Sequence, residues 1–420
     1  TSSQAALDAY IAGADGVLMA GATDKADLRR AIALDPDFAL AHIALARASF
    51  MVADVATARE GIAKARALAA KTTPREQSHI NALALAMEGK PVEALSATHA
   101  HLAEYPRDAM VAAPATGVFG LIGFSGRQGR EPEQVEFLEP LKKHLADDWW
   151  FQGVYAFALE ELGRLDEALD LIERSMAANP RNAHGAHIKA HVLYEMGRDK
   201  VGLDYLDGWL PAYAREGMMH CHISWHIALF SLIVGDTRRA WEVYEKQVAP
   251  GGAWGPALNV ATDSPAFLWR AELAGEPRRA EAWQAVNAYV QKSFPKAGIA
   301  FVDVHRALAA VAAGDGAALG PIVAELEERS AAGRAPSGDI VPRLANGLAA
   351  YGKGDWTGAI AMLEPALAGT VRIGGSRAQR DLIENTLLAA YLKAGQPAKA
   401  RGLVAQHTDR HPSVPIAGLA

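Results

Sequence analysis

The chain of 420 residues contains a single cysteine, Cys221, so it cannot form an intramolecular disulfide bond. One isolated thiol is typical of a reducing compartment, and we expect a cytoplasmic location. The first residues, TSSQAALDAYIAGADGVL, lack the basic stretch and the uninterrupted apolar run of a secretory signal peptide. The rest of the chain also lacks an apolar run long enough to cross a bilayer. We therefore expect no signal peptide, no transmembrane segment and no membrane partner.

An excess of basic residues is absent as well. The chain has 42 Lys and Arg against 48 Asp and Glu, and its formal net charge is −6. This charge disfavours nucleic acid and anionic membrane surfaces as partners. Four short motifs are also missing: the P-loop, the Gly-x-Ser-x-Gly nucleophile turn, the dinucleotide fingerprint and paired Cys-x2-Cys ligands. The chain consequently shows no motif of the common nucleotide-binding or serine-hydrolase classes.

The sequence does contain a turn glycine that recurs at intervals of 34 to 41 residues, apart from one double interval of 74. Seven of the eight glycines are followed, five residues later, by Ala or Gly. A period in this range is typical of arrays of paired helices, in which each pair buries its apolar faces only against its neighbours. The turn glycines are Gly89, Gly163, Gly197, Gly235, Gly275, Gly314, Gly354 and Gly395.

The segment Trp150–Pro180 shows this repeat most clearly. A helical period precedes Gly163, a second one follows it, and the proline then ends the second helix. The order of small, aromatic and glycine positions resembles the tetratricopeptide repeat, most closely over Asn179–Gly197. We therefore predict an all-α fold, a tetratricopeptide-repeat-like α-solenoid of about ten helix pairs that forms a right-handed superhelix with a concave ligand groove.

We divide this continuous solenoid into three parts. Residues 1–110 are predicted to form N-terminal helical repeats. Residues 111–149 are predicted to be a degenerate repeat or an inserted loop, because glycines, among them Gly120, Gly123, Gly126 and Gly129, interrupt the helical period there. Residues 150–420 are predicted to form the repeat array that carries an inner pocket of His, Trp and Arg side chains.

The first helix of each pair lines the inner surface of such arrays, and half of the 14 histidines lie between positions 184 and 305, where we place them on first helices. Two pairs, His187/His191 and His222/His226, have the i, i+4 spacing that puts both imidazoles on one helix face. Counted back from the turn glycines, the first three of these histidines point into the groove with Trp225, whereas His226 points more towards the adjacent helix. At least three imidazoles and one indole should therefore converge on one inner spot.

Imidazoles suit general acid–base catalysis, and a nearby aspartate can orient one by accepting its Nδ1 proton. Arginines in the groove, and a helix start at Gly374-Gly375-Ser376, could hold an anionic group of a substrate. The candidate catalytic residues are His222, His226, Asp303, His305 and Asp381. The candidate substrate-binding residues are Tyr155, Glu160, His187, His191, Trp225, Trp269, Arg270, Gln379 and Arg380.

The histidines have two further interpretations. His187, His191, His222 and His226 are candidate ligands of zinc or another divalent metal, although the glutamate that follows the first histidine in zinc proteases is absent from both pairs. They could also form a hydrogen-bonded polar lining without any metal. We expect no cofactor and keep a divalent metal as the alternative. Cys221, beside His222, is expected to serve packing.

Four stretches resemble the tetratricopeptide repeat protein 38-like family. They are His222–Leu229 (HISWHIAL), Gly374–Asp381 (GGSRAQRD), Tyr155–Glu161 (YAFALEE) and Phe301–His305 (FVDVH). The resemblance runs from about residue 150 to 400, and the N-terminal third matches only as generic repeats. The family pattern has histidine at the position of Arg377, so no proton transfer is expected there. The resemblance implies a cytosolic solenoid with a ligand-lined interior, and it implies no defined reaction.

Two functions of different classes follow. The first is a small-molecule enzyme of hydrolase or lyase type, with His acid/base chemistry and with or without a metal, or a ligand-binding protein. It would act in the concave pocket on an anionic small molecule. The second is a peptide- or protein-binding scaffold without catalysis, which is the usual role of these arrays. Few lysines and many histidines on the first helices favour the first function. A homo-oligomer is compatible with both functions, and no nucleic-acid partner is expected.

Overall fold

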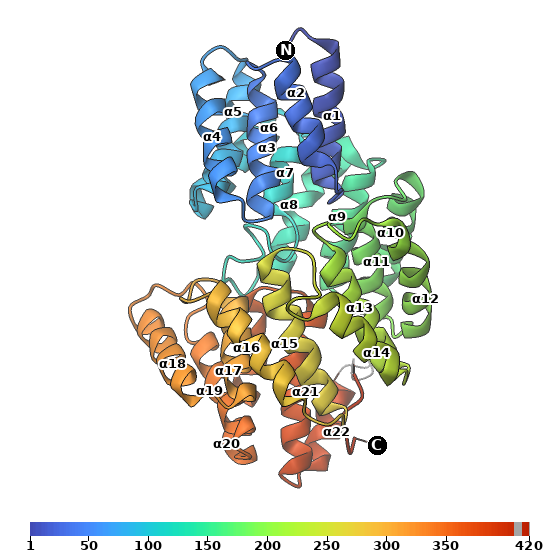
Figure 1. The fold of residues 1–420 in the computed structure, drawn as a ribbon, viewed down its shortest axis with the longest axis vertical. Helices are drawn as coiled ribbons and strands as arrows, with labels where there is room; N and C mark the ends of the chain where they lie inside the picture. The colour runs from blue at the N-terminus through green and yellow to red at the C-terminus, as the bar shows by residue number, and fades with distance from the viewer. Residues whose placement is uncertain (407–413, 420) are drawn as a thin grey trace.

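A computed structural model describes residues 1–406 and 414–419, and this part of the chain is helical and contains no β-strand (Figure 1). The predicted all-α solenoid is confirmed, because ten helix pairs follow one another from the blue N-terminal end to the red C-terminal end. The first three pairs are α1 (Gln4–Leu18) with α2 (Asp24–Leu34), α3 (Ala39–Met51) with α4 (Val55–Ala69), and α5 (Pro74–Met87) with α6 (Pro91–Glu104).

Seven further pairs form the array after residue 148. They are α9 (Trp149–Glu161) with α10 (Leu165–Ala178), α11 (Ala183–Glu195) with α12 (Asp199–Trp209), α13 (His220–Ile233) with α14 (Thr237–Val243), α15 (Ala257–Leu273) with α16 (Ala280–Ser293), α17 (Ala300–Ala313) with α18 (Gly316–Ala331), α19 (Ile340–Gly352) with α20 (Trp356–Leu363), and α21 (Arg377–Lys393) with α22 (Pro397–Ala405). Short helical turns extend three of the second helices: η2 (Leu210–Ala212), η3 (Tyr244–Val248) and η4 (Glu364–Ile373).

Each turn glycine ends the first helix of a pair in the left-handed backbone region. Gly163, with φ 76°, donates its N–H to Glu160 O at 2.8 Å, and Arg164 donates to Leu159 O at 2.9 Å. This pattern satisfies carbonyl groups that the helix end leaves unpaired, and only glycine adopts the conformation without strain. The recurring glycine therefore fixes where the first helix ends in eight of the ten pairs, whereas Ala20 and Ala53 take this conformation after α1 and α3.

The small residue five positions later lets the second helix approach its neighbours closely. Ala168, for example, is fully buried. At Gly202 an added Cβ would lie 2.5 Å from the Phe230 ring, so glycine is required there by packing. Ala280 is an exception, because an extended segment follows Gly275 and leaves this alanine exposed at the start of α16.

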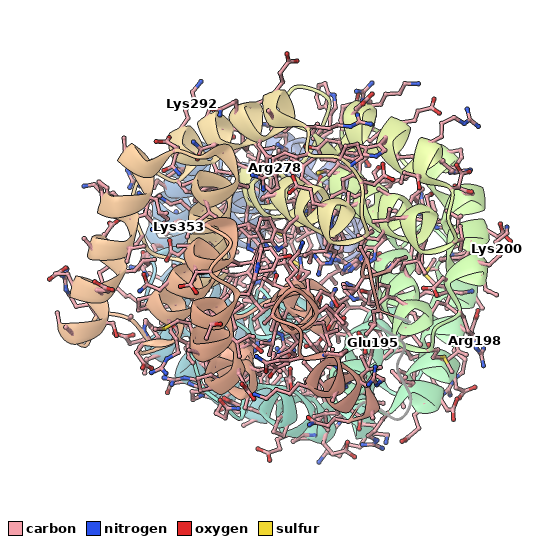
Figure 2. All side chains as sticks on the ribbon, turned by 90° about the horizontal axis from the view of Figure 1, so that it is seen from below. Glu195, Arg198, Lys200, Arg278, Lys292 and Lys353 are labelled. Carbon is pink, nitrogen blue, oxygen red and sulfur yellow. The ribbon has the colours of Figure 1, made fainter. Side chains whose placement is uncertain are left out.

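Residues 109–145 connect the two arrays through α7 (Ala109–Ala112), η1 (Ala113–Ala115), a glycine-rich segment at 116–129 and α8 (Arg130–Leu145). The glycine-rich segment is hydrogen-bonded to residues of η4, near the C-terminal end of the array. Arg372 donates from Nε to Gly126 O at 3.0 Å, and Gln128 donates from Nε2 to Ala368 O at 2.8 Å. Residues 240 or more positions apart thus lie against each other, which draws the C-terminal array into a closed ring, seen along its axis in Figure 2.

Helix α21 covers the inner side of this ring. Trp269 on α15 donates from Nε1 to Thr386 Oγ1 at 2.8 Å. Arg270, also on α15, donates to the carbonyl oxygens of Ala378 and Gln379 at 2.7 and 3.2 Å. All residues from His220 to Leu232 of α13 are buried, whereas the second helix α10 buries only one stripe. The first helices are consequently core elements, and their inner side is packed against the chain's own α21.

The carboxylate of Glu161, at the end of α9, anchors the start of α21. It accepts a hydrogen bond from the backbone N–H of Arg377 at 2.8 Å and an ion-paired bond from Arg380 Nη2 at 3.1 Å. Nη2 of Arg130, on α8, lies 3.9 Å from Glu161 Oε2, the oxygen that also accepts from Arg380. A helix N-terminus favours negative charge, so this buried carboxylate is placed where the backbone stabilises it. No helix in residues 1–406 and 414–419 has the length and apolar character needed to span a membrane.

We expect Glu161→Ala to destabilise the protein by about 3 kcal/mol, because removing one partner of a buried ion pair leaves the other charges uncompensated. Urea-induced unfolding followed by circular dichroism measures this change. The matched control is Glu167→Ala, which removes a carboxylate paired with Arg164 on an exposed surface. The control should show little change, since exposed ion pairs contribute little. Equal effects of the two substitutions would contradict the anchoring role of Glu161.

Candidate functional site

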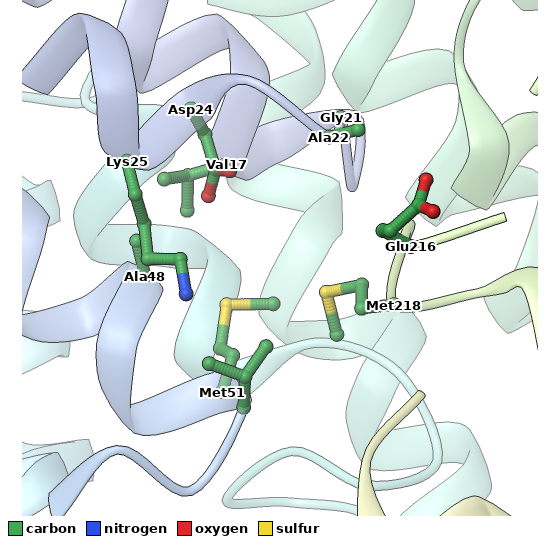
Figure 3. A pocket seen from close by; sticks show the side chains of 10 residues that line it. Val17, Gly21, Ala22, Asp24, Lys25, Ala48, Met51, Glu216 and Met218 are labelled. Carbon is green, nitrogen blue, oxygen red and sulfur yellow. The ribbon is translucent and has the colours of Figure 1, made fainter. Parts of the chain in front are cut away.

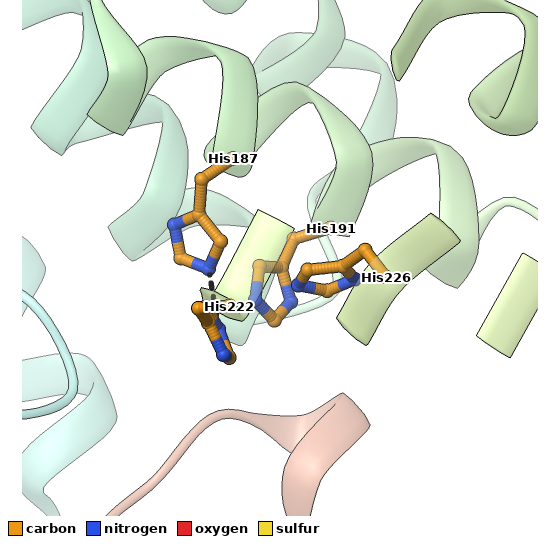
Figure 4. Close-up of side chains that lie close together, drawn as sticks. All are labelled: His187, His191, His222 and His226. Atoms are coloured by element: carbon orange, nitrogen blue, oxygen red, sulfur yellow. Dashed lines mark hydrogen bonds between the residues drawn. The ribbon is translucent and has the colours of Figure 1, made fainter. Parts of the chain in front are cut away.

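Two neighbouring first helices, α11 and α13, bring four histidines together (Figure 4). His187 and His191 project from one face of α11, and His222 and His226 project from the facing side of α13. Each pair is one helical turn apart, so the two side chains of a pair lie above each other. The repeat geometry then places the two faces opposite each other.

The four imidazoles form one compact group, called the histidine cluster below. A ring nitrogen of each residue lies within 4.8 Å of a ring nitrogen of every other. His222 Nε2 lies 3.0 Å from His187 Nε2. Ring centroids of His187 and His191, and of His191 and His226, are 4.5 Å apart. His226, expected to point towards the adjacent helix, is thus a full member of the cluster.

Asp263 on α15 orients one member of the cluster. Its Oδ2 lies 2.7 Å from Nδ1 of His222, and both side chains are buried. The Trp225 ring stacks on the same imidazole with a centroid distance of 5.3 Å and an angle of 11°. An aspartate that accepts the Nδ1 proton leaves the Nε2 lone pair directed at the other imidazoles.

Sequence reasoning missed Asp263, although a usable signal was present. It lies 12 residues before Gly275, and His222 lies 13 residues before its own turn glycine, Gly235. The two residues therefore occupy nearly equivalent positions of successive first helices. A systematic comparison of positions across repeats would have placed Asp263 on the inner side.

Burial controls the protonation of the cluster. It lowers the pKa of His187, His191 and His226 well below the usual value, and neighbouring imidazoles lower it further. Arg270 adds a positive charge near His226. These three imidazoles are therefore neutral at neutral pH, and their lone pairs are available as nitrogen donors. A substrate has no open access to them, since none of the four is more than 7% exposed.

Cys221, beside His222, is fully buried on α13. Burial raises the pKa of its thiol well above the usual value. A protonated, inaccessible thiol is neither a nucleophile nor a metal ligand. This side chain serves packing.

The structure gives Arg270, Gln379 and Arg380 partners within the chain. Arg270 is fully buried, and burial lowers its pKa, while the nearby carboxylates of Asp381 and Asp263 favour its charged form. Gln379 accepts from the backbone N–H of Ser376 at 3.0 Å and closes the helix cap of α21. Arg380 pairs with Glu161 and with Glu131.

The expected anion site at the start of α21 is therefore occupied by a carboxylate of the chain itself. Arg377 adds a further tie, with its Nε 3.4 Å from the carboxylate of Glu195 on α11. These residues join α21 to the ring and are not free to bind an anionic substrate.

Asp303 and His305 do not form the expected pair. Asp303 accepts from the backbone N–H of Gly298 at 3.1 Å, and burial raises its pKa to about 6. His305 lies with its Nδ1 2.8 Å from Phe301 O on its own helix. Burial lowers the pKa of His305 to about 4. Two positions along α17 separate the residues onto different faces, so the aspartate cannot orient this imidazole.

Three other predicted substrate-binding residues, Tyr155, Glu160 and Trp269, have different positions in the fold. Tyr155 faces α8, where its hydroxyl donates to Glu139, so it does not line the histidine cluster. Phe157 occupies that position, with ring centroids 5.7 and 5.2 Å from His187 and His191. Glu160 is fully buried on α9. Trp269 contacts the Trp283 and Tyr351 rings as well as α21, so it is part of the core.

A second polar group, His79, His101 and Asp108, lies in the N-terminal array and was not predicted. Asp108 Oδ2 lies 2.9 Å from His79 Nδ1 and 3.2 Å from His101 Nε2, and Oδ1 accepts from Val111 N–H at the start of α7. Burial alone would raise the pKa of Asp108, but the hydrogen bonds from the two histidines outweigh it and hold the pKa well below its usual range. Asp108 caps α7 and ties it to α5 and α6.

The chain matches no protein-family model. Among solved structures, it is similar to a tetratricopeptide repeat protein from Parabacteroides merdae, with 14% identity over 74% of this chain and 98% of that chain, and a TM-score of 0.30. It is also similar to the tetratricopeptide repeat domain of P58(IPK), with 13% identity, 96% and 90% coverage, and a TM-score of 0.24. Scores this low support no functional argument, and the fold assignment rests on the helix pairs themselves. The resemblance to the tetratricopeptide repeat protein 38-like family stays a prediction.

The raised pKa of Asp303 predicts a pH-dependent effect of Asp303→Asn. A carboxyl whose pKa is higher in the folded protein than in the unfolded chain stabilises the fold at low pH, and this contribution is lost as the pH rises through about 6. The variant should therefore gain stability relative to the unmodified protein between pH 4 and pH 7. The gain should reach about 3 kcal/mol, corresponding to a pKa raised from 3.8 to about 6.

Urea unfolding at a series of pH values measures the difference between the two proteins. Asp339→Asn is the control, because Arg343 lowers the pKa of Asp339 and the difference should change with pH in the opposite direction. A stability difference for Asp303→Asn that is constant from pH 4 to pH 7 would contradict the assignment.

Proposed function

We propose that the protein is a non-catalytic helical-repeat scaffold that binds a peptide segment of a partner protein. The closed inner side supports this over catalysis. The cluster imidazoles are buried, and Gln379 and Arg380 hold α21 in place. Hydrolase or lyase chemistry on an anionic small molecule gains no support from this arrangement. The usual role of helical arrays is to present a surface to other chains.

One surface feature carries the proposal: a methionine-lined cleft between the N-terminal repeats and the segment before α13 (Figure 3). Its cavity is about 60 Å³, several times the ~15 Å³ that one water molecule needs. Met51 and Met218 lie next to each other in it, with Lys25 on one side and Glu216 on the other. Methionine side chains adapt to varied apolar partners, and methionine is enriched at protein interfaces.

Exposed apolar residues flank the cleft. Val52, which lines it, is 38% exposed, and Phe50 in the same turn is 44% exposed. Trp254 is 48% exposed in a segment that packs beside Met218, since a Cβ on Gly255 would lie 3.2 Å from Met218 O. Exposed tryptophan is typical of residues that contribute most to binding energy. The cleft therefore suits one apolar anchor side chain of a peptide, flanked by polar residues that meet the charged rim.

Selection from a random peptide display library against the full chain tests this function. Affinity of a selected peptide is then measured by fluorescence anisotropy. We expect Met51→Lys to weaken binding at least tenfold, about 1.4 kcal/mol, because it places a charge at the apolar centre of the cleft. Trp254→Ala should also weaken the binding of this peptide.

The control is Met362→Lys on α20, which changes a more exposed methionine far from the cleft. It should bind the peptide like the unmodified protein. Failure to enrich any peptide, or equal affinity for the Met51→Lys protein, would contradict the proposed function.

A further inference from the structure

The histidine cluster has the composition and spacing of a metal site. Four imidazoles supply four nitrogen donors, and the donor atoms lie within 4.8 Å of one another. A tetrahedral zinc ion with Zn–N bonds of about 2.0–2.1 Å holds its donors about 3.4 Å apart. The Nε2 atoms of His222 and His187 are already 3.0 Å apart, and the donor atoms of the other two lie within 4.8 Å of them. Only α11 and α13 carry the ligands, so no rearrangement of the fold is required.

Several cluster nitrogens have no hydrogen-bond partner in the described chain. They are Nδ1 of His191 and both ring nitrogens of His226, and all are buried. Buried polar atoms in native proteins are almost always paired, so a group of unpaired nitrogens at one place calls for a ligand. A cation that accepts several nitrogen lone pairs at once satisfies more of them than a bridging water molecule does.

We propose that His187, His191, His222 and His226 bind one zinc ion, or a divalent transition metal of similar preference, in a closed four-nitrogen site. Imidazole is a preferred ligand of zinc, copper and nickel, while magnesium and calcium prefer oxygen. Four protein ligands leave no position for a substrate, which is the arrangement of structural rather than catalytic zinc. The site is therefore compatible with a scaffold that carries out no reaction.

The residues around His222 fix the orientation of its imidazole. Asp263 accepts from Nδ1 of His222, so the Nε2 lone pair faces the cluster, and Trp225 restricts the ring by stacking. A carboxylate behind a ligating histidine raises its basicity and fixes its orientation. Asp263 also supplies negative charge, as does Asp381 beyond Arg270, against the positive charge that a metal ion would bring.

The second polar group does not share these features. In that group Asp108 is engaged by His79, His101, Arg75 and the N-terminus of α7. It has its own structural role and lacks a fourth nitrogen donor. It serves as the internal comparison for the metal site.

The experiment uses the full chain without a polyhistidine tag, stripped of metal by refolding in chelator. Refolding with Zn²⁺ or Co²⁺ should load about one ion per chain, measured by mass spectrometry of the metal, because a buried site fills most readily as the protein folds. The Co²⁺ form should show the intense visible absorption of a tetrahedral complex. Loading should also raise the melting temperature, since the ion binds only the folded state.

Variants distinguish the site from unspecific uptake. His191→Ala and His226→Ala should each lose the tetrahedral spectrum, and Asp263→Asn should weaken metal affinity about 10- to 100-fold without abolishing it. His79→Ala is the matched control and should load like the unmodified protein. Circular dichroism shows whether each variant is folded.

If a cluster variant does not fold, the metal content and the Co²⁺ spectrum of the unmodified protein still test the proposal. Less than half an equivalent of metal after refolding, or octahedral Co²⁺ absorption, would overturn the proposal. So would full loading of a folded His191→Ala protein. Failure of this test leaves the peptide-binding cleft unaffected, because Met51 and Met218 lie outside the cluster.

Discussion

The contact between Glu161 and the N-terminus of α21 is the interaction on which the closed form of this solenoid depends. The carboxylate accepts from the Arg377 N–H and pairs with Arg380, and Glu131 and Arg130 complete the group. It joins the first helix of the C-terminal array to its last pair, more than 200 residues away in the chain. A solenoid without such a contact would present its inner face as an open groove.

Closure changes what the inner residues can do. In an open array, imidazoles and arginines on first helices would meet solvent and could bind a substrate. Here Arg270 is used to hold α21, the four imidazoles of the histidine cluster are shielded from solvent, and burial keeps His187, His191 and His226 neutral. The interior therefore favours structural chemistry, and the exposed cleft at Met51 and Met218 is better suited to contact other molecules.

The repeat architecture could be predicted from sequence because the turn glycines, such as Gly163 and Gly197, require a left-handed backbone that leaves a visible periodic trace. The histidine pairs could also be predicted, because i, i+4 spacing places two side chains on one face of any α-helix. Asp263 was missed, and Tyr155 was placed on the wrong side of α9, because neighbours from other helices decide these positions. The partners of Arg380 could not be foreseen, since ion pairs between residues far apart in the chain depend on how the superhelix closes.

Amide hydrogen exchange of the full chain, resolved to individual helices, tests the closed interior most directly. If α21 seals the ring, its amides exchange as slowly as those of α13, and Glu161→Ala accelerates exchange in α21 and in α11 together. Exchange in α21 as fast as in the largely exposed α18, or unchanged by the substitution, would show that the interior is open and would contradict this account.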